Sequence, residues 1–309
     1  MQKRILGTLV LIFLLLTTLY IQGKKEAWAE RALAFQSLTK PQRIVSLSLT
    51  GDEILLALVE PERIAALTYL SIDPGISNVA SQAARVKEHI AADTEKVISL
   101  KPDLVVTSSF TPDVVIQTLR QCGLRVYVFP LGNNLAQVKE SILGMAEAVG
   151  EKEKGQEVIR QMEAQEAKMA AKIKSQSVYP YRILYYGLSG NTNGQGTQFD
   201  ELVQMTGLRN VATEAGIIGR GQVDKEMLIS LNPDIIVLPT WTLKVQKADL
   251  DSAQKLMDDP SLALVEAVKT KRVYALPDPH FSCCSQNIVL AMEDLLQLAL
   301  EEKKSKDVK

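Results

Sequence analysis

Residues 95–106 read EKVISLKPDLVV and residues 226–237 read EMLISLNPDIIV, so one pattern occurs twice in this chain without a gap. In each copy an amphipathic segment ends before a Pro-Asp pair, and a run rich in β-branched residues follows. Proline disfavours helical geometry in the residue before it, so each copy is predicted to hold a short helix and then a strand. Because both strands are apolar throughout, we expect them in parallel sheets that helices cover on both faces.

A second, weaker similarity extends the repeat toward the start of each half. It relates two stretches of strand and helix: RIVSL at 43–47, followed by Asp52 and Glu53, and RILYY at 182–186, followed by Asp200 and Glu201. Further strands are predicted at 64–67, 125–129 and 272–276. Alternating strands and helices predict the α/β fold class, here as two similar α/β lobes with mainly parallel central sheets.

The length of 309 residues is typical of about two domains. We expect the N-terminal lobe at 40–134, the C-terminal lobe at 177–300 and a charged tail at 301–309. The segment 135–176 contains no proline and repeats apolar residues at helical spacing, which predicts one long backbone helix crossing both lobes, preceded by a shorter helix that ends at Gly150. A coiled-coil dimer is the alternative, although about three heptads is near the lower limit for that assignment. We expect a monomer.

The first 29 residues have the layout of a secretory signal. Lys3 and Arg4 precede an apolar run at 5–21, and AWA at 27–29 offers the small residues that signal peptidase reads. We therefore predict cleavage after residue 29 and a periplasmic location. An uncleaved N-terminal anchor is the alternative, because the run is close to the roughly 17 residues that can span a bilayer.

The composition excludes several classes of protein. Lys and Arg number 35 against 36 Asp and Glu, so no basic excess of the kind that nucleic-acid binding uses is present, and we expect no nucleic-acid partner. The 3 cysteines are too few for a disulfide scaffold, and the neighbours Cys283 and Cys284 are not expected to bond to each other, because disulfide geometry is strained between adjacent residues. The sequence contains no nucleophile elbow, phosphate loop or HExxH motif, so no enzyme is indicated.

The order and spacing of these stretches resemble the helical-backbone class of periplasmic substrate-binding proteins. The resemblance rests on 43–47 with Glu53, on 95–106, on 223–237 (VDKEMLISLNPDIIV) and on 271–274 (KRVY). It implies two α/β lobes joined by one backbone helix, with no enzyme activity and no intrinsic cofactor. It further implies capture of a metal chelate, an iron-siderophore or haem ahead of cobalamin, and delivery to an ABC permease dimer at the inner membrane.

Glu95 and Glu226 occupy matching places at the start of the two repeated helices. An acidic residue in the first turn interacts favourably with the helix macrodipole, by under about 1 kcal/mol, which is one explanation for either glutamate. The resemblance implies more, because the matching glutamates of the family's cobalamin-binding member dock into arginine pockets on the permease. Since charges at an interface rim steer and orient two proteins, we expect both glutamates to face the permease.

Ligand-binding residues are expected in the loops that follow strand carboxyl ends, where open α/β sheets place their ligands. The candidates are Ser48, Thr50, Tyr69, Ser108, Ser109, Phe110, Tyr186, Asn191, Asn193, Arg220, Trp241, His280, Phe281 and Ser282. By the resemblance, Tyr69 and Tyr186 match aromatic positions of the cobalamin binder, whereas Ser108 and Arg220 stand where that protein has tryptophan. These departures favour an anionic ligand, since a guanidinium pairs well with oxyanions. A solvated loop residue is the alternative for Arg220, which lies among glycines.

The sequence HFSCC at 280–284 is a tight cluster of soft metal ligands. A zinc site would need a fourth ligand, which the sequence does not obviously supply, so no resident metal site is expected. An axial His280 or Tyr69 would suit the iron of a bound haem. Hydrogen bonding to neighbouring groups is the commoner use of a loop histidine.

Two other functions are kept as alternatives. A bilobal metal chelatase would use His280 and a glutamate such as Glu201 to insert metal into a tetrapyrrole, and it would turn over porphyrin and metal. A ligand-sensing module would need a membrane receptor as its partner. A transport protein should instead bind one equivalent of ligand and leave it unchanged, so turnover and stoichiometry separate the three functions.

Overall fold

The computed structural model describes residues 40–187, 189–239 and 248–307. Residues 42–309 belong to one compact unit, and the description that follows is of that unit. The predicted signal segment 1–29 and Trp241 lie outside the described residues. No helix among the described residues combines the length and the apolar character that crossing a bilayer requires.

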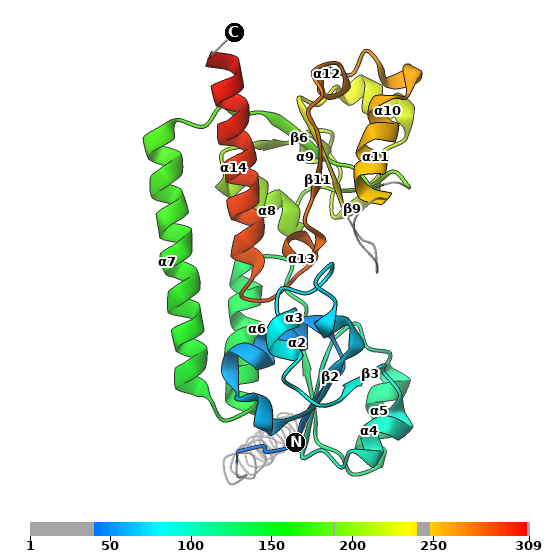
Figure 1. Ribbon diagram of the computed structural model, residues 1–309, viewed down its shortest axis with the longest axis vertical. Helices are drawn as coiled ribbons and strands as arrows, with labels where there is room; N and C mark the ends of the chain where they lie inside the picture. Colours follow the sequence, from blue (N-terminus) through cyan, green and yellow to red (C-terminus); the bar gives the residue numbers. More distant parts are fainter. Residues whose placement is uncertain (1–39, 188, 240–247, 308–309) are drawn as a thin grey trace, which may run out of the picture. The chain divides into compact units, whose positions relative to one another are not determined.

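The first sheet has five parallel strands in the order β3-β2-β1-β4-β5 (Figure 1). Their bounds are β1 (Ile44–Ser46), β2 (Ile64–Thr68), β3 (His89–Ile90), β4 (Leu104–Ser108) and β5 (Val126–Phe129). The central strands β1 and β4 are buried at every residue, as expected for strands that are covered on both faces.

The second sheet has four parallel strands in the order β11-β10-β6-β8. Their bounds are β6 (Arg182–Tyr185), β8 (Arg209–Asn210), β10 (Ile235–Pro239) and β11 (Val273–Leu276). If β6 is the counterpart of β1 and β10 that of β4, as the sequence repeat requires, the order β2-β1-β4-β5 equals β8-β6-β10-β11. The predicted fold class, two similar α/β lobes with parallel sheets, is therefore confirmed.

Helices connect and cover the two sheets (Figure 1). In the first lobe these are α2 (Leu49–Leu58), α3 (Ala80–Ala83), α4 (Thr94–Ser99), α5 (Asp113–Gln121) and α6 (Leu135–Ala148). The second lobe has α8 (Gln198–Met205), α9 (Val211–Glu214), α10 (Lys225–Leu231), α11 (Ala248–Met257), α12 (Glu266–Lys269), α13 (Asp278–Phe281) and α14 (Ile288–Asp307). Short 3₁₀ helices lie at η1 (Pro61–Arg63), η2 (Tyr69–Ile72) and η3 (Pro260–Leu262).

The backbone helix is α7 (Lys152–Gln176), and Gly150 with φ of +74° separates it from α6, as the sequence predicts. Val158, Met162 and Met169 are buried on α7 and belong to one apolar cluster with Ile44 of the first sheet and Ile183 of the second. The buried residues of the apolar stripe thus pack against the chain's own core.

The repeat holds at the level of single hydrogen bonds. Asp103 accepts from the backbone N–H of Arg43 at 3.0 Å, and Asp234 accepts from that of Arg182 at 2.9 Å. The same arginines also donate from their guanidinium groups to carbonyls just after the helix that precedes each Pro-Asp pair. Arg43 bonds the Leu100 carbonyl, and Arg182 bonds the Asn232 carbonyl. Each Pro-Asp pair therefore fastens the start of the first strand beside it, which explains why the motif recurs.

One part of the second lobe differs from the sequence interpretation. The glycine-rich stretches that we treated as loops form an antiparallel ribbon of β7 (Asn191–Asn193) and β9 (Arg220–Gln222). The reason is close backbone approach, because a Cβ at Gly194 would stand 2.1 Å from the Ile217 carbonyl oxygen, and one at Gly221 would stand 2.5 Å from the Ile217 side chain.

Candidate functional site at the strand carboxyl ends

The strands within each central sheet are parallel, so their carboxyl ends share one edge, and the predicted ligand-binding residues follow those ends. In the first lobe Tyr69 follows β2 and is 50% exposed, while Phe110 follows β4 and is 75% exposed. Ile72 is exposed as well, and Ser109 lies beside Phe110 at the surface. This edge of the lobe therefore exposes large apolar side chains.

Three other predicted residues of the first lobe, Ser48, Thr50 and Ser108, are less exposed. Ser108 is buried at the end of β4. The Ser48 hydroxyl accepts from the Gly51 N–H at 3.2 Å and caps α2, and Thr50 lies half-buried in the first turn of that helix. Capping satisfies backbone donors that a helix start leaves free, so the conformation of this loop is fixed locally.

In the second lobe the ribbon carries Arg220 and Asn191, both exposed, and Asn193 pairs with Arg220 across the two strands. Ile218, just before the ribbon strand, is 78% exposed. Tyr186 is placed differently from a cleft aromatic, because it is only 7% exposed and packs in the core of its lobe. The described part of this lobe thus exposes the cationic Arg220 and, two positions earlier, the apolar Ile218.

Arg220 lies close enough to Cys284 to affect it electrostatically. Burial raises the pKa of the Cys284 thiol to about 11, and the Arg220 guanidinium opposes that shift. The Cys284 Sγ lies 3.3 Å from Gln198 Oε1, and the buried Cys283 thiol lies 3.4 Å from the His280 carbonyl oxygen. Both cysteines are free thiols held by local contacts, and burial raises the pKa of each. Among the residues that the structure describes, no three His, Cys, Asp or Glu side chains converge as a metal site.

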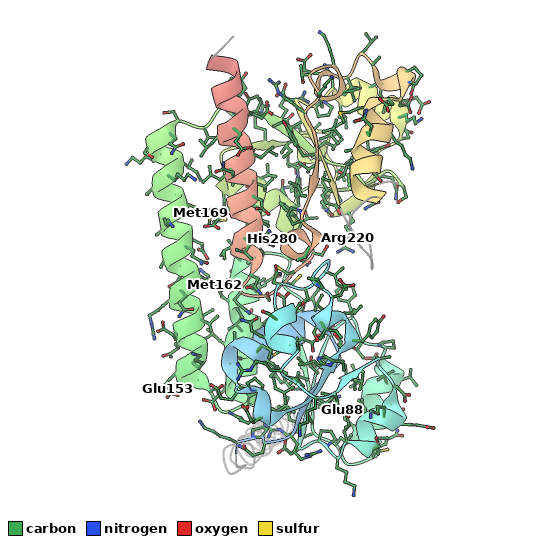
Figure 2. The ribbon with its side chains drawn as sticks, viewed as in Figure 1. Glu88, Glu153, Met162, Met169, Arg220 and His280 are labelled. Carbon is green, nitrogen blue, oxygen red and sulfur yellow. The ribbon has the colours of Figure 1, made fainter. Side chains whose placement is uncertain are left out.

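His280 is held in place by a carboxylate. Its Nδ1 lies 2.5 Å from Asp294 Oδ2 on α14, and this contact fixes the orientation of the ring. Figure 2 shows His280 and Arg220 on the side of the second lobe that faces the first. The neighbouring Phe281 packs its ring 6.5 Å from that of Phe199 and so contributes to the core, while Ser282 is exposed.

Sequence reasoning missed a polar contact between the lobes. Glu53 on α2 is fully buried, and its carboxylate accepts from Asn78, Ser285 and Asn287. The Asn78 amide also donates to the Pro279 carbonyl at 2.6 Å. On the other side, Glu201 of α8 accepts from the backbone N–H of Leu135, the first residue of α6, at 2.7 Å. The only sequence signal for this contact is the repeated Asp-Glu pair.

Asp52 and Asp200, the other members of these pairs, stay within their own lobes. Asp52 is fully buried and accepts from the backbone N–H of Thr68 and from its hydroxyl. Burial raises the pKa of Asp52 to about 8, with the Thr68 hydrogen bonds acting against that shift. Asp200 accepts from Asn210 at 3.0 Å and from the Thr213 hydroxyl at 2.6 Å.

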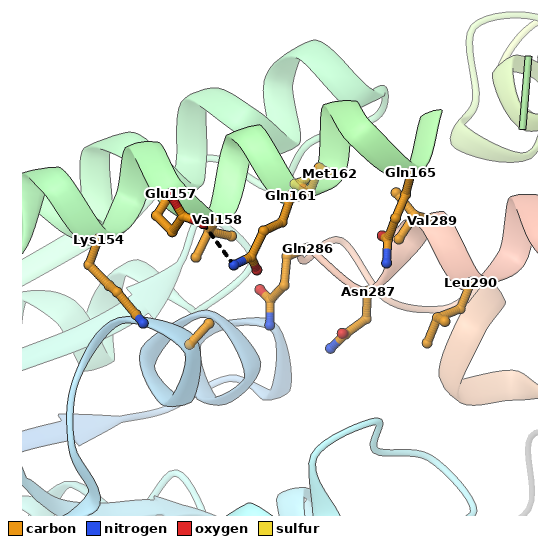
Figure 3. Close-up of a pocket in the computed structure, with 11 residues that line it drawn as sticks. Lys154, Glu157, Val158, Gln161, Met162, Gln165, Gln286, Asn287, Val289 and Leu290 are labelled. Atoms are coloured by element: carbon orange, nitrogen blue, oxygen red, sulfur yellow. Dashed lines mark hydrogen bonds between the residues drawn. The ribbon is translucent and has the colours of Figure 1, made fainter. Parts of the chain in front are cut away.

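A pocket of about 260 Å³ lies elsewhere, between α7 and the ends of α2 and α14 (Figure 3). Amide side chains of Gln161, Gln165, Gln286 and Asn287 line it. None of the predicted ligand-binding residues belongs to this pocket. It is placed behind the lobe contact, since Gln286 and Asn287 both also donate to Glu53.

The two glutamates predicted to meet the permease occupy equivalent structural places. Glu95 lies in the first turn of α4 and Glu226 in the first turn of α10, and both are exposed. Each helix is capped by the aspartate two positions earlier, Asp93 or Asp224. The matching caps give both carboxylates the same local setting, one in each lobe.

Comparison with known proteins adds to this geometry. The family model for periplasmic binding proteins matches residues 44–279. YvrC of Bacillus subtilis (strain 168), named an uncharacterized ABC transporter substrate-binding lipoprotein, is 24% identical over 265 residues, which are 84% of this chain and 80% of YvrC. The molybdate-binding protein MolA of Haemophilus influenzae is 22% identical over 231 residues, 68% of this chain and 62% of MolA. The apo structure of the periplasmic haem-binding protein RhuT from Roseiflexus sp. RS-1 has a TM-score of 0.70 at 23% identity, with 84% of this chain and 98% of RhuT covered.

Proposed function

The chain belongs to the periplasmic binding protein family, and on that premise we propose that it captures an anionic metal complex between its lobes and delivers it to an ABC permease. Substrate-binding components of ABC transporters act by holding a ligand, so the proposal requires no covalent chemistry. The observation that carries the choice of ligand class is the exposed Arg220 of the second lobe together with exposed apolar side chains, Ile218 two positions earlier and Tyr69 and Phe110 at the strand carboxyl ends of the first lobe.

The chemistry of these side chains suits a large ligand with two kinds of surface. Tyr69, Phe110 and Ile218 offer apolar area, which a macrocycle or aromatic chelator can cover. The Arg220 guanidinium pairs with carboxylates or other oxyanions through a planar fork of donors. We therefore place an iron-siderophore or haem ahead of a corrinoid, with His280 Nε2 as the candidate axial ligand if the cargo is haem.

The names of the relatives support an anionic ligand, and one of them adds a bare oxyanion as a candidate. RhuT is named for haem and MolA for molybdate, and both cargoes carry negative charge. A bare oxyanion would need little apolar surface, whereas this chain exposes two aromatic rings and an isoleucine there. The cargo proposed here is therefore a chelate, and a bare oxyanion is an outcome that the experiment below can return.

The metal chelatase alternative receives no support from the side chains it would use. Glu201, its candidate base, bonds the Leu135 N–H at the start of α6, and His280 Nδ1 is bonded to Asp294. We propose that the protein binds its ligand without turnover. We further propose an exported monomer that acts outside the inner membrane, with the segment 1–29 either removed or serving as an anchor. The lobes are those predicted at 40–134 and 177–300, and the first lobe also includes α6, which packs on α2 and β5.

The direct test is to purify the protein from its native host and record its absorption spectrum together with its metal content. We expect about one equivalent of a visibly absorbing metal chelate per chain, since haem, ferric siderophores and corrinoids absorb differently from one another. A colourless protein that carries molybdenum would replace the chelate by an oxyanion. A protein that converts porphyrin and metal to product would overturn the proposal in favour of the chelatase.

A further inference from the structure

The two lobes contact each other through a pair of glutamates that the sequence repeat places in equivalent positions. Glu53 lies on α2, the helix after the first strand of the first lobe, and Glu201 lies on α8, the helix after the first strand of the second lobe. Glu53 bonds residues that lead into α14, the last helix of the second lobe, and Glu201 bonds the first residue of α6, the last helix of the first lobe. The contacts are therefore reciprocal.

We propose that Glu53 and Glu201 are positioning residues that hold the ligand-free lobes at their working separation. The first latch is Glu53 with Ser285 and Asn287, and the second latch is Glu201 with Leu135. The proposal rests on the proposed function in one respect: holding the lobes apart is useful because a ligand is proposed to bind between them. Moving the lobes apart must lengthen the hydrogen bonds of both latches, because each bond joins one lobe to the other.

The first latch is a carboxylate whose hydrogen-bonding capacity is filled by three residues, Asn78 of its own lobe and Ser285 and Asn287 of the other. Oε1 accepts from the Asn78 backbone N–H and from its side-chain amide, each at 3.0 Å. Oε2 accepts from the Asn287 amide at 3.0 Å and from the Ser285 hydroxyl. The Ser285 oxygen itself accepts from the Asn287 N–H at 3.1 Å, so its own proton is directed at Glu53. Glu53 thus acts as an acceptor at every bond.

Because Glu53 is buried, its carboxylate depends on these protein donors in place of water. Glu53 and Ser285 are both fully buried, and no ion pair to Glu53 exists among the described residues, so these four donors replace its water shell. Hydrogen bonds to a charged group are worth more than neutral ones, and a lost partner leaves a buried charge undersatisfied. Small changes in lobe position are therefore opposed, while full opening would let water replace the donors.

The second latch has a single hydrogen bond across the lobes and is less buried. Glu201 is only half-buried, and it meets the N–H at the start of α6, where the helix macrodipole favours a negative charge. Helix α6 packs on α2, and α14 packs on α8, so each belongs to the lobe of that partner. Glu201 therefore bonds the first helix turn of the opposite lobe's α6, and Glu53 bonds the segment that leads into the opposite lobe's α14. We expect Glu53 to dominate and Glu201 to add a smaller part.

The first test is hydrogen exchange on the ligand-free protein as its host exports it. Glu53→Gln keeps the size of the side chain but turns an NH₂ group toward donors. In this variant we expect the backbone amide of Asn287 in the opposite lobe, whose N–H bonds Ser285, to lose about tenfold or more of its protection, because the charge-assisted hydrogen bonds that hold this segment are lost. Glu201→Gln should do the same at the Leu135 amide to a smaller extent. Exchange in β1, β4, β6 and β10 should stay unchanged, which a merely destabilised fold would not allow.

The second test measures lobe separation by electron spin resonance between two labels. The exposed Cys122 serves as one label site, and Lys269→Cys on α12 provides the other, in a Cys284→Ser background; Cys283 is buried and left in place. Glu53→Gln and Glu53→Gln with Glu201→Gln should shift the distance distribution to longer values, in that order. Glu62→Gln, an exposed glutamate in η1, is the matched control and should leave the distribution unchanged.

If Glu53→Gln does not fold, Ser285→Ala removes one donor from the opposite lobe and leaves the glutamate in place; a smaller shift in the same direction is expected. Folded Glu53 and Ser285 variants with an unchanged distance distribution would overturn the proposal. Because no ligand is present in either test, that failure would leave the transport function standing, and a wrong ligand class would leave the latches standing.

Discussion

At the scale of single residues, two copies of one Asp-Glu pair perform two different tasks. Neighbouring residues on a helix point roughly 100° apart. Asp52 and Asp200 therefore point into their own lobes, where threonine and asparagine side chains bond them, while Glu53 and Glu201 point toward the other lobe. Position on the helix, and not residue chemistry, decides which carboxylate supports a lobe and which joins the two.

Asp52 makes the stability of the protein dependent on pH. Its pKa rises from 3.8 unfolded to about 8 in the folded protein, so the folded state holds this proton more tightly. The resulting stabilisation is complete below the unfolded pKa and is lost as pH rises through about 8. The loss is at most about 1.4 kcal/mol per pH unit for one group. Asp52→Asn should flatten the decline, and urea unfolding between pH 5 and 8 measures it.

The equivalent residue of the other lobe is the control for that experiment. Asp200 accepts from Gly196, Gln204, Asn210 and Thr213, more donors than an amide oxygen can satisfy. We expect Asp200→Asn to destabilise the protein at every pH. An Asp52→Asn variant whose unfolding free energy keeps the wild-type pH profile would contradict the assignment of that profile to Asp52.

At the scale of helices and strands, the repeated Pro-Asp motif contains a difference between the lobes. The residue before proline is Lys101 in one copy and Asn232 in the other, and both are left-handed, with φ of +47° and +42°. Asparagine tolerates this conformation, and the Asn232 side chain also accepts from the Glu266 N–H at 2.7 Å. Lysine is disfavoured in the left-handed conformation, and it has no side-chain amide that could accept a compensating hydrogen bond.

Lys101→Gly should therefore stabilise the first lobe. We expect a gain of about 0.5–1 kcal/mol, because relief of left-handed strain outweighs the greater chain entropy of glycine. Thermal and urea unfolding report it. Asn232→Gly is the matched substitution in the second lobe, and since it removes the bond to Glu266 it should not stabilise. Equal effects of the two substitutions would show that the strain argument is wrong.

Much of the fold was predictable from the sequence because it depends on local signals. The helices before and the strands after each Pro-Asp pair, the break at Gly150 and the stripe on α7 all follow from spacing along the chain. The candidate site was less accessible. Glu53 bonds a serine 232 positions away, and Tyr186 is buried by residues of its own lobe, so neither environment is encoded by neighbouring residues. The β7–β9 ribbon was hidden by its glycines, which here mark close backbone contact.

At the scale of the whole molecule, one helix and a bonded lobe contact limit how the lobes can move. Helix α7 packs on α2, α6 and α14, and so contacts elements of both lobes. We expect limited closure on binding, without the wide hinge motion that flexible linkers permit. Small-angle scattering of the free and ligand-bound protein should give nearly equal radii of gyration. A large drop on binding would contradict a stiff connection.

The predicted docking to the permease also belongs to this scale, because its two candidate glutamates lie one in each lobe. We expect Glu95→Ala with Glu226→Ala to abolish uptake in cells and to leave ligand affinity unchanged, since both side chains are exposed and neither is among the proposed ligand residues. Uptake assays and titration of the purified variant measure the two effects. The exposed pair Glu62→Ala and Glu153→Ala is the control. Loss of ligand binding in the docking variant would refute this role.

Titration of the protein with hemin and with ferric siderophores tests the central claim, capture of one anionic metal complex, most directly. We expect saturation at about one equivalent of one of these probes, recovered chemically unchanged. Arg220→Ala should weaken that binding by roughly tenfold to a hundredfold, as expected for a lost charge-assisted hydrogen bond. Arg85→Ala, an exposed arginine of the first lobe, should have no effect. Turnover of the probe, or affinity that does not depend on Arg220, would contradict the account.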